Sequence, residues 1–357
     1  MLTSFTVKSC NFNITLQNSS YKQREDMAVK VAINGLGRIG RCVARIIADR
    51  SDIELVAVNA SGSEQMLEYN LKYDSVHGRR DDVSVKDGYV NIGTTKAKIF
   101  AQRELSEIDF ASTGAEVVLE CTGAFLTAQS VQPYLDNGIQ KVLFSAPAKD
   151  DTATFVIGAN EAEYNGETIV SNASCTTNGL APVAKVLEDA FGIEKGLMTT
   201  IHSYTSSQPI LDAKHKKDPR KGRSGATNLV PTTTGAAKAI AKVLPSLTGK
   251  LNGQAIRVPT PDVSLVDLTV TLNNDASLEG VKKAFKDASE GSHKGVLGVD
   301  EEYRVSQDFV GEELSSVVAM DTIQVIDNNM VKVLAWYDNE WGYSCRLVDM
   351  AILISKK

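Results

Sequence analysis

Cys175 is the residue of this sequence with the most distinctive chemical context. It stands among small hydroxyl and amide side chains in the segment 174–178, and the apolar spacing that follows predicts an amphipathic helix from near Cys175 or Pro182 to about Phe191. At a helix N-terminus, unpaired amides and the positive end of the dipole favour the thiolate, the form of cysteine that acts as nucleophile or metal ligand. Taken alone, Cys175 also fits a cysteine that only packs in a core.

His202 is the candidate base for this nucleophile. It ends a predicted strand, 197–202, that follows the helix, so that a helix and a return strand can bring the two side chains to one edge of a sheet. A cysteine–histidine pair supplies both a nucleophile and the base that activates it. A histidine held for structural reasons is the alternative for His202 taken by itself.

The other histidines and the cysteines show no metal-ligand spacing. His77 lies in an expected loop, whereas His215 and His293 sit in lysine-flanked polar stretches and are expected to be solvated. The five cysteines are scattered and form neither a disulfide framework nor a CxxC pair. We therefore expect no metal site and a reducing compartment.

The elements upstream of Cys175 predict a dinucleotide-binding fold. A short apolar strand, 29–34, runs directly into a GxGxxG sequence at 35–40, and apolar spacing then marks a helix. In this order the glycines let the backbone approach a pyrophosphate that lies on the helix N-terminus. A glycine turn that serves only tight strand–helix packing is the alternative. The cofactor contacts expected from this segment are Asn34, Gly35, Leu36, Gly37, Arg38, Ile39 and Gly40.

The end of the next strand bears on which dinucleotide is bound. The strand 53–59 ends where a carboxylate is expected to hold the adenosine ribose, yet Ala60 follows it, with Ser61 and Ser63 close by. Without an acid, no charge at this position repels a 2'-phosphate. The site is therefore open to NADP as well as NAD, unless an acid elsewhere in the chain takes over this role.

Further strands complete the predicted architecture, an α/β fold in two domains. Those at 116–121, 141–145 and 169–172 extend a Rossmann domain, whose strand ends make Thr122, Gly123 and Ser145 cofactor-contact candidates, although a plain turn also explains Ser145. The alternating strands after Cys175 indicate an α+β catalytic domain on a mostly antiparallel sheet: 197–202, 264–270, 322–326 and 331–336.

The domain boundaries follow from this pattern. We expect a flexible N-terminal extension at 1–26, a NAD(P)-binding Rossmann domain at 27–174 that a C-terminal helix at 340–357 completes, and a catalytic domain at 175–339.

Composition limits the class of partner. The chain has 357 residues, of which 43% are hydrophobic and 23% charged, and a net charge of -6. Its most basic cluster is 214–217, and no apolar run approaches the length of a membrane span or a secretory signal. We expect a cytoplasmic protein that acts on small molecules, with no nucleic-acid or membrane partner.

Several motifs together resemble one family, the bacterial-type phosphorylating glyceraldehyde-3-phosphate dehydrogenases. The resemblance runs from Ala28 to the C-terminus in the family's order. It rests on NGLGRIGR at 34–41, SNASCTTN at 171–178, HSYT at 202–205, TGAAK at 234–238, RVPTP at 257–261 and WYDNEWGY at 336–343.

The resemblance implies a covalent mechanism. Cys175 attacks the aldehyde of glyceraldehyde 3-phosphate to give a thiohemiacetal, His202 takes the proton as hydride passes to NAD or NADP, and inorganic phosphate cleaves the resulting thioester to give 1,3-bisphosphoglycerate. An erythrose-4-phosphate dehydrogenase, which hydrolyses its thioester, is the alternative within this fold, and a non-catalytic binding protein is an alternative of another class.

The resemblance also implies roles for further residues and a homotetramer, with the loop 211–223 near a subunit interface. The expected substrate-phosphate and attacking-phosphate ligands are Ser174, Thr176, Thr205, Lys221, Thr234, Gly235 and Arg257. The expected cofactor contacts outside the glycine turn are Ala60, Arg103, Thr122, Gly123, Ser145, Lys214, Asn339 and Tyr343.

Overall fold

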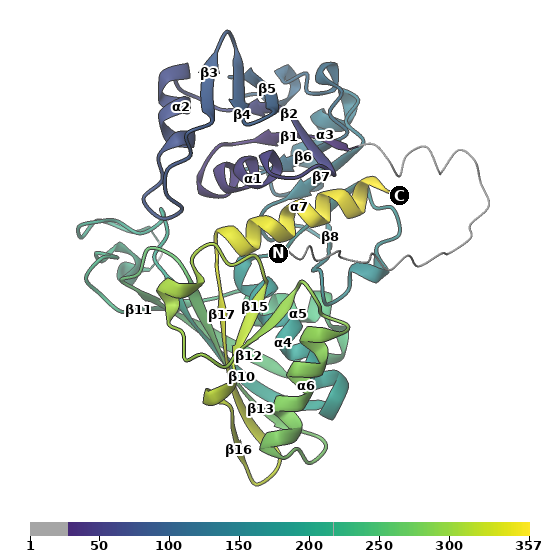
Figure 1. Ribbon diagram of the computed structural model, residues 1–357, viewed down its shortest axis with the longest axis vertical. Coiled ribbons are helices and arrows are strands. Elements are labelled where there is room, and N and C mark those ends of the chain that lie inside the picture. Colours follow the sequence, from purple (N-terminus) through teal and green to yellow (C-terminus); the bar gives the residue numbers. More distant parts are fainter. Residues whose placement is uncertain (1–27, 217) are drawn as a thin grey trace, which may run out of the picture.

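Two β-sheets, each with its own helices, organise the chain, and the long helix α7 (Trp341–Ser355) runs between them (Figure 1). The computed structural model describes residues 28–216 and 218–357. The predicted flexible extension at 1–26 therefore lies outside the described residues. In the described part of the chain, no helix is long and apolar enough to cross a membrane.

The first sheet has nine strands in the order β3-β4-β5-β2-β1-β6-β7-β9-β8. Neighbours from β5 to β8 pair in parallel, whereas β3, β4 and β5 form an antiparallel edge. Its central strands are almost continuous apolar runs, as expected where helices cover both faces. The strands are β1 (Val29–Asn34), β2 (Ile53–Asn59), β3 (Val83–Lys86), β4 (Tyr89–Ile92), β5 (Thr95–Phe100), β6 (Val117–Glu120), β7 (Lys141–Phe144), β8 (Ala153–Thr154) and β9 (Ile169–Ser171).

Helices α1 (Arg38–Ala48), α2 (Glu64–Lys72) and α3 (Ala128–Asp136) accompany this sheet. The C-terminal helix α7 packs against α1, and its apolar residues, such as Leu347 and Val348, share one buried core with Val31 and Ile33 of β1. The last residues of the chain thus return to the first sheet.

The second sheet has eight strands in the order β11-β12-β10-β13-β17-β15-β14, with β16 paired to β17. Five of its pairings are antiparallel and two are parallel, which confirms the predicted α+β character. The strands are β10 (Ile193–Ser203), β11 (Val230–Thr233), β12 (Leu251–Val258), β13 (Ser264–Leu272), β14 (Leu297–Asp300), β15 (Ser316–Ala319), β16 (Gln324–Ile326) and β17 (Met330–Tyr337).

Helix α4 (Cys175–Phe191) packs beside α5 (Ala236–Val243) and α6 (Leu278–Glu290) over this sheet. It begins at Cys175, the earlier of the two predicted starts, because the Ser174 hydroxyl accepts a hydrogen bond from the Thr177 N–H (3.0 Å) and so caps the first turn. Gly192, at φ 69°, ends it.

Short 3-10 turns complete the chain. They are η1 (Leu105–Glu107), η2 (Ala111–Thr113), η3 (Glu161–Glu163), η4 (Pro219–Gly222), η5 (Pro245–Leu247), η6 (Ser306–Phe309) and η7 (Met320–Thr322).

One sequence-based expectation about histidines is wrong. His293 is buried, and its ring contacts the Ser292 hydroxyl (2.9 Å) and the Gly158 carbonyl (3.1 Å). The lysines beside it suggested a solvated side chain, but the turn after α6 directs the ring inward, where two hydrogen bonds satisfy its nitrogens. His215, by contrast, is exposed as expected.

Candidate active site

The structure brings the predicted nucleophile and base together. Cys175 is the first residue of α4, His202 lies at the end of β10, and Cys175 Sγ is 3.5 Å from His202 Nε2. This separation is within the reach of a sulfur hydrogen bond and lets a proton pass directly between the two side chains.

The turn that presents Cys175 is strained. Ala173 has a φ of 56°, a left-handed conformation that is uncommon for residues with a Cβ and that clusters at functional sites. The Tyr343 hydroxyl, on α7, donates to the Ala173 carbonyl (3.0 Å) and helps hold this conformation. Tyr343 is one of the predicted cofactor contacts, and its hydroxyl supports the turn before the nucleophile.

A backbone carbonyl and the guanidinium group of Arg257 lie against the His202 ring. Its Nδ1 lies 2.7 Å from the Ser203 carbonyl and 2.7 Å from Arg257 Nη1, which also donates to the Ser203 carbonyl (2.9 Å). The β10–β12 register places His202 opposite Arg257. Burial first, and then the positive charge of Arg257, lower the pKa of His202 to about 3. The imidazole is therefore neutral near pH 7.

The ionisation of Cys175 corrects the sequence-based expectation. Burial raises the pKa of the Cys175 thiol above its usual value, and the charge of Arg257 and hydrogen bonds from Thr176 oppose this only in part. The helix N-terminus alone thus does not make a standing thiolate here, because desolvation outweighs it. The raised pKa of Cys175 and the lowered pKa of His202 place a thiol beside a neutral imidazole.

Tyr337 is a residue of this site that sequence reasoning missed. Its hydroxyl contacts the hydroxyls of Thr176 (3.0 Å) and Thr200 (2.8 Å), and its ring stands edge-on to His202 with centroids 6.0 Å apart. A Cβ added at Gly179 would lie 2.9 Å from the ring, so the glycine makes room for it. The predicted strand at 331–336 stopped one residue short of Tyr337, and no short-range pattern indicated its contacts.

The expected phosphate ligands divide into two groups. The Ser174 hydroxyl caps α4, and the Thr176 hydroxyl is engaged by Tyr337. Thr205 is partly exposed and contacts Ser207 through its hydroxyl (2.8 Å). Arg257 lies beside His202, with its Nη1 2.7 Å from His202 Nδ1.

The other expected phosphate ligands lie on separate segments. Thr234 and Gly235 precede α5, where the Thr234 hydroxyl accepts from the Ala236 N–H (3.2 Å) and Gly235 is exposed. A helix N-terminus with a glycine and a hydroxyl suits an anion. Lys221 belongs to η4 and is partly exposed.

A pocket of about 510 Å³ opens at the carboxyl ends of the strands in the first sheet. Predicted cofactor residues that line it are Asn34, Gly35, Leu36, Gly37, Ala60, Arg103 and Thr122. Gly35 has a φ of 95°, and a Cβ there would lie 2.8 Å from the Thr122 side chain. A Cβ at Gly40 would lie 2.0 Å from the Gly35 carbonyl, whereas Gly37 has open space. Gly35 and Gly40 therefore allow close packing of backbone and side chains, and Gly37 keeps open space at the pocket.

The rim of this pocket carries no acidic side chain among the described residues. Ala60 and Ser61 stand at the end of β2, and Arg41 and Arg103 also line the pocket. Ser63 is instead the cap of α2, where its hydroxyl accepts from the Met66 N–H (3.2 Å). A dinucleotide with or without a 2'-phosphate suits this set, because two guanidinium groups and a hydroxyl favour anions.

A buried network below the pocket was also missed by sequence reasoning. Asn34 donates to Glu120 Oε2 (2.7 Å) and accepts from Asn59 Nδ2 (2.8 Å), and Glu120 accepts the Thr122 N–H (2.8 Å). Burial raises the pKa of the Glu120 carboxyl. The ends of β1, β2 and β6 are thus joined by side chains beneath the predicted cofactor position.

The remaining predicted cofactor residues do not line this pocket: Arg38, Ile39, Gly40, Gly123, Ser145, Lys214, Asn339 and Tyr343. The Arg38 side chain turns away to pair with Asp74 and Glu340. Asn339 lies nearer the reacting pair, where its Oδ1 accepts from the hydroxyls of Ser203 (2.9 Å) and Ser264 (2.6 Å). Its amide orientation is thereby set.

Comparisons with known proteins agree with this geometry. Residues 29–128 match the NAD binding domain of glyceraldehyde 3-phosphate dehydrogenase, and residues 174–339 match its C-terminal domain. The glyceraldehyde-3-phosphate dehydrogenases of Shimwellia blattae and Salmonella typhimurium, and glyceraldehyde-3-phosphate dehydrogenase A of Escherichia coli K12, are each 50% identical to it over 331 residues, which is 92% of this chain and 100% of each relative. The chain belongs to the glyceraldehyde-3-phosphate dehydrogenase family.

Proposed function

We propose that the chain oxidises glyceraldehyde 3-phosphate and transfers the acyl group to inorganic phosphate, giving 1,3-bisphosphoglycerate in glycolysis and gluconeogenesis. The observation that carries this proposal is the Cys175–His202 pair at 3.5 Å, placed at a helix N-terminus beside Arg257. NAD or NADP, when bound, accepts the hydride.

Cys175 and His202 divide the covalent chemistry. As the sulfur bonds to the aldehyde carbon, the thiol proton moves to His202 and from there to the carbonyl oxygen, which becomes a hydroxyl and leaves His202 neutral again. During oxidation this oxygen loses its proton to His202 and a thioester remains on Cys175. A phosphate oxygen then attacks the thioester carbon, the carbon–sulfur bond breaks, and the sulfur leaves as thiolate.

Arg257 links the substrate phosphate to the base. A guanidinium has only N–H donors, so its 2.7 Å contact uses the lone pair of His202 Nδ1. A bound substrate phosphate competes for the same guanidinium through charge-assisted hydrogen bonds. Once Arg257 turns to it, Nδ1 can donate to the Ser203 carbonyl and Nε2 presents its lone pair to Cys175.

We assign cofactor binding and substrate chemistry to different parts of the chain, with the boundary after residue 174. We assign cofactor binding to 27–174 together with the helix at 340–357, because α7 shares the core of the first sheet. We assign substrate binding and chemistry to 175–339, since Cys175, His202 and Arg257 all belong to elements of the second sheet and its helices.

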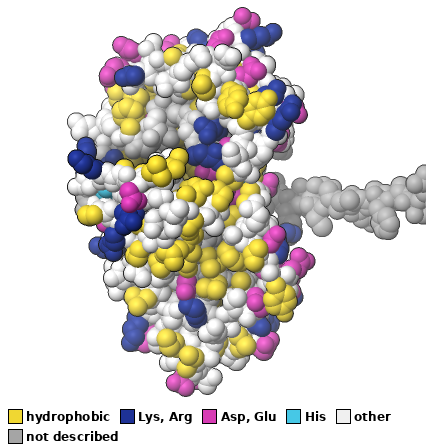
Figure 2. Space-filling view, turned by 90° about the vertical axis from the view of Figure 1, so that its left-hand side faces the viewer, with side chains coloured by type: hydrophobic (Ala, Val, Ile, Leu, Met, Phe, Trp, Pro, Cys, Tyr) yellow, Lys and Arg dark blue, Asp and Glu magenta, His cyan; other side chains and the backbone are white. Residues whose placement is uncertain are grey.

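We also propose that the chain works as a homotetramer in the cytoplasm. Large apolar side chains are strongly exposed on and near the second sheet, notably Leu197 (68%), Ile210 (81%) and Leu229 (69%). Figure 2 shows apolar side chains gathered on one face of this part of the molecule. Such patches favour subunit contacts. The free cysteines Cys42, Cys121, Cys175 and Cys345 suit a reducing compartment.

The test is the formation of reduced cofactor from glyceraldehyde 3-phosphate, with and without inorganic phosphate. We expect turnover with phosphate and a collapse of the steady-state rate without it, because the thioester then persists. Equal rates in both conditions would instead indicate hydrolysis of the thioester, as in an erythrose-4-phosphate dehydrogenase, and would overturn the proposed acceptor. Light scattering that shows an active monomer would overturn the tetramer.

A further inference from the structure

Two buried serines hold the amide oxygen of Asn339, a residue that lies between β17 and α7. Asn339 Oδ1 accepts hydrogen bonds from the Ser203 hydroxyl (2.9 Å) and the Ser264 hydroxyl (2.6 Å). Ser203 ends β10 and Ser264 begins β13, and both residues are almost fully buried. Because two O–H donors approach from one side, they decide which end of the amide is the oxygen. The Asn339 oxygen is therefore fully used inside the protein.

The amide nitrogen of Asn339 is in the opposite situation. It makes no hydrogen bond within the part of the chain that the structure describes, although Asn339 is only 6% exposed. The nitrogen is not fully enclosed, so a ligand can reach it. Polar groups in such places are normally paired. The unused N–H2 group therefore indicates an acceptor that comes from outside the chain.

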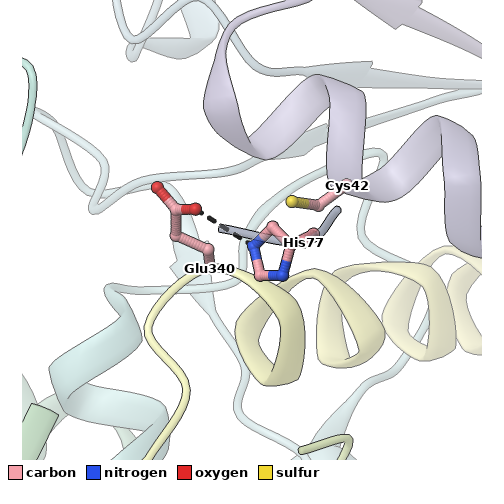
Figure 3. A group of neighbouring side chains, drawn as sticks. All are labelled: Cys42, His77 and Glu340. Carbon is pink, nitrogen blue, oxygen red and sulfur yellow. Dashed lines mark hydrogen bonds and ion pairs between the residues drawn. The ribbon is translucent and has the colours of Figure 1, made fainter. Parts of the chain in front are cut away.

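The backbone around Asn339 is held independently of the two serines. Asp338 accepts the N–H groups of the two residues that follow Asn339 (2.9 and 2.7 Å). Glu340 Oε2 lies 3.1 Å from His77 Nε2, and the same carboxylate pairs with Arg38. Figure 3 shows the His77 ring directed at Glu340. The segment is thus fixed on both sides of Asn339, and the serines decide only how its side chain is turned.

Ser203 also contacts the proposed base. Its carbonyl oxygen lies 2.7 Å from His202 Nδ1, while its N–H donates to the Ser264 hydroxyl oxygen (3.1 Å). Ser203 is thus joined to His202 through its carbonyl and to Asn339 through its hydroxyl. In the proposed reaction, hydride leaves the carbon bonded to Cys175 while His202 removes a proton, so the nicotinamide ring has to lie beside this pair. The free N–H2 group of Asn339 suits the carboxamide oxygen of that ring.

We propose that Ser264 and Ser203 are positioning residues, which turn the Asn339 N–H2 group toward the nicotinamide carboxamide of the cofactor. The inference rests on the proposed function for the identity of the cofactor, and it adds the residues that orient the group that contacts the reacting ring. Without the serine hydroxyls the Asn339 side chain is free to rotate, and cofactor binding then has to immobilise it. The serines reduce this cost of binding by fixing the amide in advance.

The test measures the affinity of the full chain for NAD, NADP and ADP-ribose by calorimetry. ADP-ribose keeps the adenosine and the pyrophosphate but lacks the nicotinamide ring. We expect Ser264→Ala to weaken the binding of NAD and NADP by about threefold to tenfold, the contribution of one hydrogen bond, and to leave ADP-ribose unchanged. An equal loss for all three ligands, or no loss for NAD and NADP, would overturn the proposal.

This experiment is separate from the test of the proposed reaction, because it contains neither aldehyde nor phosphate. A parent protein that binds neither dinucleotide would overturn the proposed function itself. A parent that binds both, with a Ser264→Ala variant that loses affinity for all three ligands equally, would overturn only the role of the serine.

Two further variants test whether the serines act through Asn339. Ser203→Ala removes one of the two donors and keeps the carbonyl that contacts His202, so we expect the same selective loss of NAD and NADP even if Ser264→Ala folds poorly. Asn339→Ala should weaken NAD and NADP at least as much, and adding Ser264→Ala to it should cause no further loss. Additive losses in the double variant would contradict a role through Asn339.

Ser316→Ala is the matched control in the same sheet. This serine is also fully buried, and its hydroxyl donates to the Gly179 carbonyl. We expect the variant to lower the melting temperature and to bind all three ligands normally. A selective loss of NAD and NADP in Ser316→Ala as well would show that any buried serine of the sheet has this effect, and would overturn the assignment to Ser264 and Ser203.

Discussion

The choice between NADP and NAD is predicted to depend on Ala60. This residue ends β2 and lines the pocket together with Ser61, Arg41 and Arg103. Its methyl group leaves the ribose position without a negative charge. The substitution Ala60→Asp introduces that charge at the same place, while Ala60→Asn introduces a side chain of the same shape without it.

The expected magnitude follows from Coulomb's law. A carboxylate about 5 Å from a phosphate with about 1.5 negative charges, at an effective dielectric constant of about 40–80, gives about 1.2–2.5 kcal/mol of repulsion. This corresponds to about an 8-fold to 70-fold loss of kcat/KM for NADP relative to NAD. The charge of Arg41 or Arg103 near the same phosphate reduces the effect, and added salt screens it further.

The assay is kcat/KM for each cofactor in the parent, Ala60→Asp and Ala60→Asn, at low and high salt. We expect the parent to use NADP at least as well as NAD, Ala60→Asp to prefer NAD, and Ala60→Asn to change the ratio little. A parent that is strictly NAD-dependent would refute the interpretation of Ala60. Equal shifts in the Asp and Asn variants would show that shape, not charge, controls the choice.

Four further predictions concern the reacting pair and the glycine turn. Cys175→Ser should abolish oxidation while cofactor binding persists. In the unmodified protein, iodoacetamide should label Cys175 before Cys42, Cys121 or Cys345. Preferential labelling of another cysteine would contradict the assignment of Cys175 as nucleophile. His202→Asn should lower turnover about 10²–10⁴-fold, and a near-normal rate would remove His202 from the mechanism. The pKa of His202 is lowered to about 3 in the folded state, so the unfolded chain takes up the proton first as the pH falls. The stability of the fold should therefore decrease below about pH 6.5, by up to about 1.4 kcal/mol per pH unit. Urea unfolding above and below about pH 6.5 should show this loss, and His202→Asn should lack the part of the loss that His202 causes. Gly40→Ala should destabilise the fold by about 1–3 kcal/mol, because its Cβ would lie 2.0 Å from the Gly35 carbonyl. Gly37→Ala has open space around it, so this variant should keep the melting temperature and weaken cofactor binding. Equal stability of the two variants would contradict the packing argument.

The sequence by itself determined the elements and the chemistry that short-range patterns encode. The strand, glycine turn and helix at residues 29–48 follow from hydrophobic period and from backbone freedom, which are local properties of the chain. The sequence predicted the helix that follows Cys175 but left its start open between Cys175 and Pro182, and the Ser174 cap seen in the structure decides for Cys175. His202 was identified because a strand ends there and few other histidines are present.

The tertiary structure decided what depends on contacts between distant segments. Desolvation raises the pKa of Cys175 against the effect of the helix dipole, and the pairing of β10 with β12 brings Arg257 against His202. The inward turn of His293 likewise arises from the packing around it. Burial and charge at these residues are sums over neighbours from several elements, so no single stretch of sequence contains them.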